Sequence, residues 1–220
     1  MYIVGMKLTG KALSCERGGR QVFDGLDFSV ESGGMLELRG PNGAGKTSLL
    51  RMIAGLNDPA QGEFELIGGQ DDVPLAQFCH FIAHQEAFKP ALSVAENLQF
   101  WADFFGASGV ENEILAALEA FSMEPLADLS SALLSAGQKR RLALGRLAMI
   151  KRPIWLLDEP TVGLDKKSVG QLQVLMRQHL DTGGIIIATT HIDLGMDDAK
   201  VFDFATLPAL DADDLLEDLA

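Results

Sequence analysis

The stretch Gly40-Pro41-Asn42-Gly43-Ala44-Gly45-Lys46-Thr47 decides the fold. It has the pattern G-x-x-x-x-G-K-[ST], in which the backbone N–H groups of a glycine-rich loop surround an anion and the next helix points its positive end at it. Lys46 offers a point charge to the β and γ phosphates of a nucleotide, and the Thr47 hydroxyl is a suitable ligand for Mg²⁺. The stretch therefore predicts a phosphate-binding loop.

The sequence on both sides of this loop fits that prediction. Met35-Leu36-Glu37-Leu38-Arg39 reads as a short strand that ends at the loop. After the loop, apolar residues recur at helical spacing, namely Leu49, Leu50, Ile53 and Leu56. A strand before the loop and a helix after it are the context in which a phosphate loop occurs.

Two continuous apolar runs in the last third predict buried parallel strands. They are Ile154-Trp155-Leu156-Leu157 and Ile185-Ile186-Ile187-Ala188, with a helix expected between them at about 166–180. Residues of about 86–150 have helical periodicity and form an insertion, so the order of elements predicts an α/β fold. An aromatic cluster inside the insertion is interpreted as a packed helix face rather than a ligand box: Phe100, Trp101, Phe104 and Phe105.

Two acidic residues, Asp158-Glu159, end the first apolar run. Ligands of open α/β sheets bind beyond the carboxyl ends of the strands. A carboxylate placed there holds Mg²⁺, and a second one orients a water for attack on the γ-phosphate. Gln85 and His191 also stand where strands are expected to end, which makes them further candidates.

Ser135 begins another helix, and its interpretation stays open at this point. Ser135 is a good N-cap, and Ala136 and Gly137 leave the backbone N–H groups of the helix start accessible. The segment is either a capped helix and nothing more, or a second anion site. A second anion site is surplus in a chain with one phosphate loop, unless two chains share each nucleotide.

The composition excludes several classes of protein. The chain has 220 residues, 47% of them hydrophobic, so a disordered chain is excluded. With 18 Lys and Arg against 31 Asp and Glu, its net charge of −13 argues against a nucleic-acid partner. The acids gather in residues 203–220, interpreted as a solvated tail, whereas Lys139-Arg140-Arg141 is expected to be positive where the nucleotide sits. No apolar run approaches a membrane span, so a membrane role requires partner chains.

The order of these motifs resembles the ATP-binding subunits of ABC transporters over about residues 2–203. Gly40 to Thr47, followed by Ser48, look like the Walker A loop, and Ile154 to Asp158 look like the Walker B strand. Glu159 matches the catalytic glutamate, and Leu134 to Gln138 match the signature motif. The remaining matches are the Q-loop glutamine, the D-loop and the switch histidine, namely Gln85, Val162 to Asp165 and His191.

The resemblance implies a P-loop NTPase fold of the ABC ATPase type. Residues 1–220 would form one ABC ATPase domain, with a RecA-like core at about 1–85 and 151–203, an antiparallel β subdomain, a helical subdomain at about 86–150 and an acidic tail at 204–220. It also implies a head-to-tail dimer, in which ATP lies between the Walker A loop of one copy and the signature of the other. That arrangement would use the surplus anion site.

The resemblance further implies the role of each site residue. Glu159, His191 and Gln85 would be catalytic, and Thr47, Asp158 and Gln85 would hold Mg²⁺. The remaining contacts to ATP would come from the phosphate loop, from the signature and from the D-loop: Gly40 to Ser48, Ser135, Gly137, Gln138 and Asp165.

A narrower resemblance is to the haem-exporter branch used in bacterial cytochrome c maturation. Its marks include Cys15-Glu16-Arg17, Lys89-Pro90-Ala91-Leu92 and Trp155 to Thr161. This branch implies a subunit at the cytoplasmic face of the inner membrane that couples ATP hydrolysis to transport or haem release through integral membrane subunits, which would dock around Phe88 to Ser93. The alternatives are an exporter of another cargo and a soluble scaffold ATPase of the iron–sulfur assembly type.

Two departures from the family pattern concern the nucleotide site. The region where many members stack an aromatic ring on adenine reads Cys15-Glu16-Arg17-Gly18-Gly19, and we expect the Arg17 guanidinium to take that place. In the signature, Ala136 stands where a glycine is common.

Overall fold

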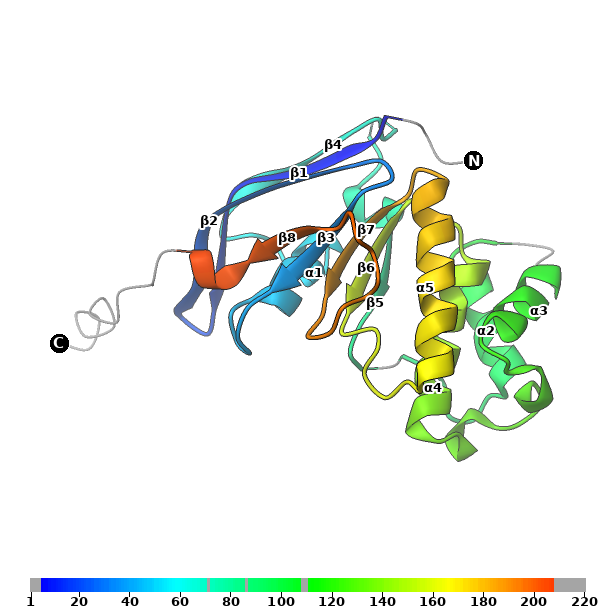
Figure 1. Cartoon of the computed structure of the whole chain (residues 1–220). Coiled ribbons are helices and arrows are strands. Elements are labelled where there is room, and N and C mark those ends of the chain that lie inside the picture. Colours follow the sequence, from blue (N-terminus) through cyan, green and yellow to red (C-terminus); the bar gives the residue numbers. More distant parts are fainter. Residues whose placement is uncertain (1–4, 71, 86, 108–110, 208–220) are drawn as a thin grey trace.

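The computed structural model describes residues 5–70, 72–85, 87–107 and 111–207. Figure 1 shows an antiparallel sheet, a central parallel sheet with helices on both faces, and a helical part at one side. Among the described residues, no helix combines the length and the apolar character needed to cross a bilayer. The main elements are β1 (Lys7–Arg17), β2 (Arg20–Glu31), β3 (Met35–Arg39), α1 (Lys46–Ile53), β4 (Gln61–Ile67), β5 (Cys79–Ile82), α2 (Val94–Phe104), α3 (Glu111–Ala120), α4 (Ala136–Met149), β6 (Ile154–Asp158), α5 (Lys166–Asp181), β7 (Ile185–Thr189) and β8 (Lys200–Asp203).

The order of strands brings the predicted site residues to one edge of the parallel sheet. The strands of this sheet lie in the order β5-β6-β7-β3-β8, and the antiparallel sheet has the order β2-β1-β4. In the parallel register Thr189 lies beside both Leu38 and Asp158. The phosphate loop, which follows β3, is therefore only one strand away from the acidic end of β6. The α/β fold expected from the sequence, with an additional antiparallel sheet, is confirmed.

The side chains of β6 alternate between the two faces of the sheet. Ile154 and Leu156 belong to the core shared with α1 and the antiparallel sheet, whereas Trp155 and Leu157 belong to the core shared with α2 to α5. Burying each of these side chains contributes about 1.5–3 kcal/mol, so both faces hold β6 in place. A strand covered on both faces has no polar side, which explains the continuous apolar run.

Side-chain caps fix where the helices begin. Ser93 and Glu96 form a capping box at the start of α2, and Ser135 and Gln138 form another at the start of α4. Asp165 accepts a hydrogen bond from the Ser168 N–H at the start of α5. Such caps are typically worth about 1 kcal/mol each, and here they set the positions of the signature and the D-loop.

The structure corrects three expectations. Helix α1 ends at Ile53, so Leu56 lies beyond it and is 56% exposed. In the aromatic cluster, Trp101 and Phe105 pack against the core but Phe104 is 68% exposed, because the cluster is wider than the buried stripe of α2. The tail expected from residue 204 starts later, since Phe204 is buried and packs edge-on against Phe23. Most of that tail, residues 208–220, lies outside the described residues.

Two buried histidines flank Trp155 in the core. His80 is the register partner of Trp155 on β5, and the His179 ring of α5 stacks on the Trp155 ring with centroids 3.8 Å apart. Burial lowers the pKa of His179 to about 4, although hydrogen bonds to the Ile185 and Pro153 carbonyls act in the opposite direction and raise it. Burial and nearby arginines also hold the pKa of His80 well below its usual value.

The stability of the protein should therefore fall as the pH is lowered below about 6.5. The unfolded chain binds a proton at each of these histidines near pH 6.5, whereas folded His179 binds one only near pH 4. In that window the free energy of unfolding should fall by up to about 1.4 kcal/mol per pH unit for each histidine. Urea unfolding at pH 7, 6 and 5 measures it.

His179→Phe is the matched variant, because it keeps an aromatic ring against Trp155 and removes the titrating group. We expect its free energy of unfolding to depend less steeply on pH than that of the wild type. The same pH dependence in both proteins would show that His179 does not contribute.

Candidate active site

The phosphate loop has a backbone that only glycine tolerates at its two ends. Gly45 has φ of +102°, and a Cβ atom there would lie 2.6 Å from a ring carbon of Phe23. Gly40 has φ of +134°, and a Cβ atom there would lie 2.9 Å from the Cβ of Phe204. The loop is thus packed between the antiparallel sheet and the turn that follows β8.

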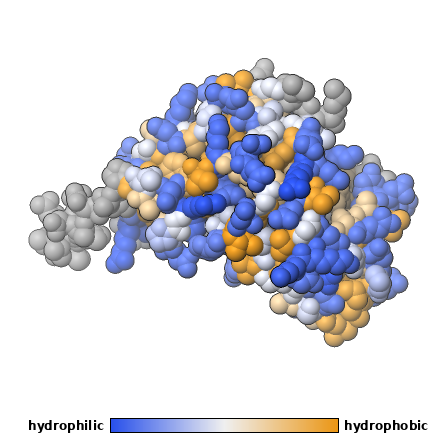
Figure 2. Space-filling view, viewed as in Figure 1, coloured by the Kyte–Doolittle hydropathy of each residue, from blue (hydrophilic) through white to orange (hydrophobic). Residues whose placement is uncertain are grey.

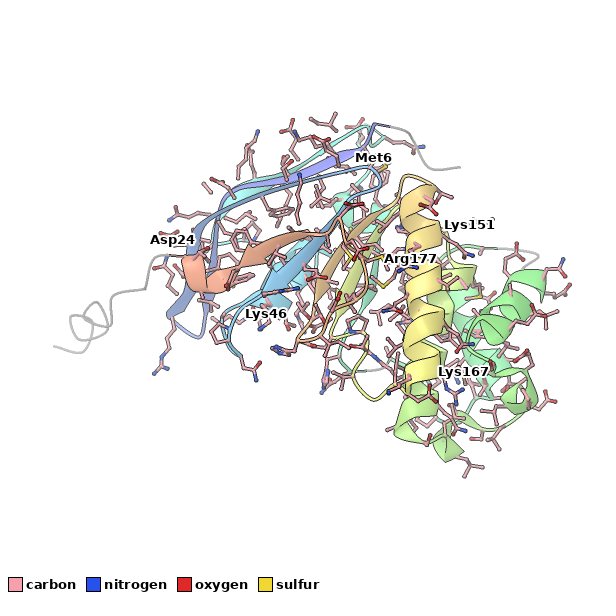
Figure 3. All side chains as sticks on the ribbon, viewed as in Figure 1. Met6, Asp24, Lys46, Lys151, Lys167 and Arg177 are labelled. Carbon is pink, nitrogen blue, oxygen red and sulfur yellow. The ribbon has the colours of Figure 1, made fainter. Side chains whose placement is uncertain are left out.

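Lys46 points into the loop. Its Nζ donates hydrogen bonds to the carbonyl oxygens of Gly40 and Pro41, at 2.7 and 2.9 Å. Figure 3 shows Lys46 at the end of β3 where the loop turns into α1. A buried ammonium with only carbonyl partners gains a full counter-charge when an anion enters the loop, which is the property that a phosphate site requires.

Thr47, Asp158 and Thr189 form a group of oxygen ligands beside the loop. The Thr47 hydroxyl lies 3.1 Å from both carboxylate oxygens of Asp158, and the Thr189 hydroxyl donates to Asp158 Oδ1 at 2.8 Å. Asp158 is 4% exposed, so its carboxylate is held by these hydroxyls rather than by bulk water. A hydroxyl and a carboxylate are the ligand types that Mg²⁺ prefers, so the donor set fits that metal.

Glu159 is held at three points. Its N–H donates to the Thr189 hydroxyl at 2.8 Å, its carbonyl accepts from Arg140 at 2.7 Å, and its carboxylate Oε1 lies 3.1 Å from His191 Nε2. Its φ of +47° lies in the left-handed region, which costs a residue with a side chain about 1–2 kcal/mol. The surrounding hydrogen bonds therefore maintain a strained backbone, and they fix where its carboxylate points.

These groups open into one cavity of about 380 Å³. The Arg17 side chain reaches the cavity from β1, with a 3.5 Å contact to the Asn57 side chain. The cavity thus collects residues from the antiparallel sheet, the loop, α1, β6 and β7. Its lining residues are Arg17, Val22, Asn42, Gly43, Gly45, Lys46, Thr47, Ser48, Arg51, Asp158, Glu159 and Thr189.

The other predicted residues lie elsewhere in this chain. Gln85 lines a second cavity, of about 640 Å³, together with Ala136 and Gly163, and it does not line the first one. A Cβ atom at Gly137 would lie 2.9 Å from the carbonyl oxygen of Gly163, so the signature and the D-loop touch within one chain. Nothing from the signature lines the first cavity in the described part of the chain.

Two predicted residues of these segments already have structural roles. Gln138 completes the capping box with Ser135. The Asp165 carboxylate caps α5, and the hydrogen bonds from Ser168 lower its pKa. Both caps leave the helix starts ordered and at the surface.

Arg140 does not lie where the sequence predicts it. It was expected to add positive charge beside the nucleotide, but it is 2% exposed and its guanidinium points inward. It donates to four backbone carbonyls, those of Ala83, Asp158, Glu159 and Pro160. Helical periodicity would have been the available signal, because position 140 falls on the buried side of α4 together with Leu144 and Leu147.

Comparison with known proteins identifies the family. The family model described as ABC transporter matches residues 23–162, which is more than half of the chain and includes the phosphate loop and Asp158. This chain belongs to the ABC transporter family. Among solved structures, a putative ABC transporter ATP-binding protein from Pyrococcus furiosus has a TM-score of 0.79 and 26% identity, covering 91% of this chain and 98% of the other.

Two relatives within the ABC family share about half of their residues with this chain. The cytochrome c biogenesis ATP-binding export protein CcmA of Rhodopseudomonas palustris (strain HaA2) is 51% identical over 87% of this chain and 94% of its own length. The protein of the same name from Bradyrhizobium diazoefficiens is 51% identical over 89% of this chain and 97% of its own length.

A second solved structure is similar in fold. It is a dimeric ATP-binding cassette in a post-hydrolysis state, bound to ADP and Pi, and it is 25% identical, with a TM-score of 0.72 over 84% of this chain and 88% of the other.

A pair of glycine substitutions tests the packing of the loop. Gly43 and Gly45 both have positive φ, but a Cβ atom at Gly43 meets nothing within 4 Å. Gly43→Ala should cost about 1–2 kcal/mol of stability from backbone strain alone. Gly45→Ala should cost about 1–3 kcal/mol more, because the methyl group overlaps Phe23. Urea unfolding measures both, and equal losses would show that the Phe23 contact does not constrain the loop.

Proposed function

We propose that this ABC protein is the ATP-hydrolysing subunit of the exporter that serves cytochrome c biogenesis. Hydrolysis would be coupled to transport or to haem release. The observation that carries the ATPase assignment is the meeting of the phosphate loop, Asp158 and Glu159 on one cavity. The export assignment is supported by the relatives, which share about half of this sequence over nearly their whole length.

The first cavity binds the phosphates of ATP. The loop from Gly40 to Ser48 surrounds the phosphates with the backbone N–H groups of its residues other than Pro41, and Lys46 exchanges its carbonyl partners for the β and γ oxygens. Thr47 and Asp158 hold Mg²⁺, which would neutralise charge that develops on the phosphate oxygens. Arg17 lies at the mouth of the same cavity, and its planar guanidinium offers a stacking surface for the base.

Glu159 and His191 act on the attacking water. The Glu159 carboxylate accepts a hydrogen bond from the water and orients it toward the γ-phosphate. His191, 3.1 Å from that carboxylate, keeps it in place and contacts the γ-phosphate from its exposed position. Gln85 lies three residues after β5 and lines the second cavity, so it would sense the same phosphate and complete the metal ligands by moving toward the first cavity.

A second copy of the chain completes the site. Ser135, Gly137, Gln138 and Asp165 would contact ATP held by the other copy, which is supported by the fact that none of them lines the first cavity of its own chain. Figure 2 shows apolar side chains along the lower edge of the molecule, near the start of α4 and the loop after β7. Large exposed apolar residues include Leu133 just before α4, Val162 in the D-loop and Ile192 after β7. An ADP-bound dimer is known for the similar cassette.

The helical part at about 86–150 links the site to the membrane subunits. In this proposal residues 1–220 act as one ABC ATPase unit at the cytoplasmic face of the inner membrane. The segment from Phe88 to Ser93 receives a helix of a membrane subunit, and it lies beside the second cavity, which Gln85 and Phe88 line. A change at the γ-phosphate sensed by Gln85 would thus reach the docking segment three residues later.

Glu159→Gln should lower kcat for ATP hydrolysis by roughly 10²–10³, the cost of one aligned transition-state group. ATP binding should persist, because the phosphate loop and Asp158 are unchanged, and the closed dimer should accumulate. Phosphate release and size-exclusion chromatography with ATP measure these effects. The control is Glu63→Gln, at an exposed glutamate of β4, which should hydrolyse ATP at the wild-type rate. Unchanged turnover in Glu159→Gln would overturn the assignment.

Lys89→Glu should prevent assembly with the membrane subunits. The Lys89 Nζ lies over the Phe100 ring at 4.5 Å, so the change reverses a charge on the surface proposed to dock. We expect the membrane subunit recovered in pull-downs to fall by at least about 100-fold, because like charges at an interface cost several kcal/mol and about 1.4 kcal/mol is tenfold in affinity. Turnover of the isolated chain should be unchanged. Lys200→Glu, on the exposed edge strand β8, is the control. Intact assembly of Lys89→Glu would contradict the docking proposal.

The same pull-down separates the exporter from its alternatives. Recovery of integral membrane subunits supports the exporter, and the identity of those subunits distinguishes cytochrome c biogenesis from another cargo. Recovery of soluble assembly proteins alone would instead support a scaffold ATPase.

A further inference from the structure

Arg140 joins three parts of the ATPase that lie far apart in the sequence. It is the fifth residue of α4, whose start carries the signature. Its Nη1 donates to the Ala83 carbonyl at 2.8 Å, just after β5, and its Nη2 donates to the carbonyls of Asp158 and Glu159 at 2.9 and 2.7 Å. A single guanidinium thus connects the signature helix with the segments that lead to Gln85 and Glu159.

The carbonyl contact to Glu159 matters because the backbone of Glu159 is strained. With φ of +47°, the residue occupies a region that L side chains rarely adopt, so its conformation depends on partners that hold it there. Thr189 holds the N–H of Glu159, and Arg140 holds its carbonyl. The direction of the Glu159 side chain follows from this fixed peptide, because χ1 rotamers depend on φ and ψ.

Arg140 is suited to this task by shape and by burial. It is 2% exposed, and its planar fork presents donors to several carbonyls at once from one rigid group. An ammonium donates from a single nitrogen, whereas the contacts to Ala83 and Glu159 come from two different nitrogens of the guanidinium. These four hydrogen bonds all go to backbone carbonyls, so they act on the course of the backbone itself.

We propose that Arg140 is a positioning residue of the ATPase: it fixes the peptide of Glu159, and so the direction of the Glu159 carboxylate, relative to the signature helix. The inference rests on the proposed role of Glu159 in orienting the attacking water. It goes beyond that role because it names the group that makes the carboxylate point correctly and connects it with α4.

Arg140→Met removes the donors and keeps the length of the side chain. A displacement of a reacting group by about 1 Å costs up to roughly 10² in rate, so we expect kcat to fall by about 10- to 100-fold. The KM for ATP should change by less than about threefold, because Arg140 is not among the described residues that line the ATP cavity. Arg140→Lys, with one nitrogen in place of the fork, should recover part of the lost kcat.

The matched control is Arg146→Met, six residues later on the same helix. Arg146 is also buried, at 5% exposed, and its Nε donates to the Ala143 carbonyl at 3.1 Å. This variant loses a buried arginine–carbonyl contact of the same kind, and its kcat should stay within about twofold of the wild type. Thermal unfolding of all variants shows whether they are folded, and if Arg140→Met is not, Arg140→Lys takes its place in every comparison.

A double-mutant cycle on the full chain provides the decisive measurement. If Arg140 acts through Glu159, adding Arg140→Met to Glu159→Gln should lower the single-turnover rate by less than about twofold, although it lowers the wild-type rate at least tenfold. An equal loss on both backgrounds, or a wild-type kcat in Arg140→Met, would overturn the proposal. Wild-type turnover in Glu159→Gln alone would instead overturn the proposed function, so the two failures are distinguishable.

Discussion

The position of Asp158 is the constraint on which the rest of the site depends. Its carboxylate is buried at the end of β6 and is held by the hydroxyls of Thr47 and Thr189. A buried carboxylate needs such partners, because an unpaired charge in the interior is costly. Thr47 comes from the start of α1 and Thr189 from the end of β7, so this one side chain aligns three elements. The strained Glu159 follows directly, and the Thr189 hydroxyl serves both residues.

Much of the fold follows from patterns that are local in the sequence. The phosphate loop and the apolar run of β6 were recognisable because each combines a motif with a neighbouring strand. The strands β1 and β4 were harder to predict, since β1 has register shifts and a positive φ at Ala12 that interrupt its alternation. β5 and β8 have only four residues each, too few for a periodic signal, and their strand pairing comes from tertiary contacts.

The site shows the same division between local and tertiary information. Lys46, Thr47, Asp158 and Glu159 line one cavity, as their motifs predicted. The inward turn of Arg140 was not predicted, because a run of three basic residues usually lies on a solvated face. Burying a guanidinium requires several carbonyls that the chain supplies from Ala83 and from residues 158–160. Residues 139–141 alone do not predict those partners. The carbonyls come together only when β5 and β6 pair.

The contact between Phe204 and the phosphate loop has a consequence for how the protein is made. The strand β8 pairs with β3, and Phe204 then packs where a side chain on Gly40 would otherwise lie. The motif for binding phosphate is thus translated early, but the residues that brace it come more than 150 positions later. Since chains fold from the N-terminus during synthesis, the loop reaches its final shape only after β8 and Phe204 have been synthesised.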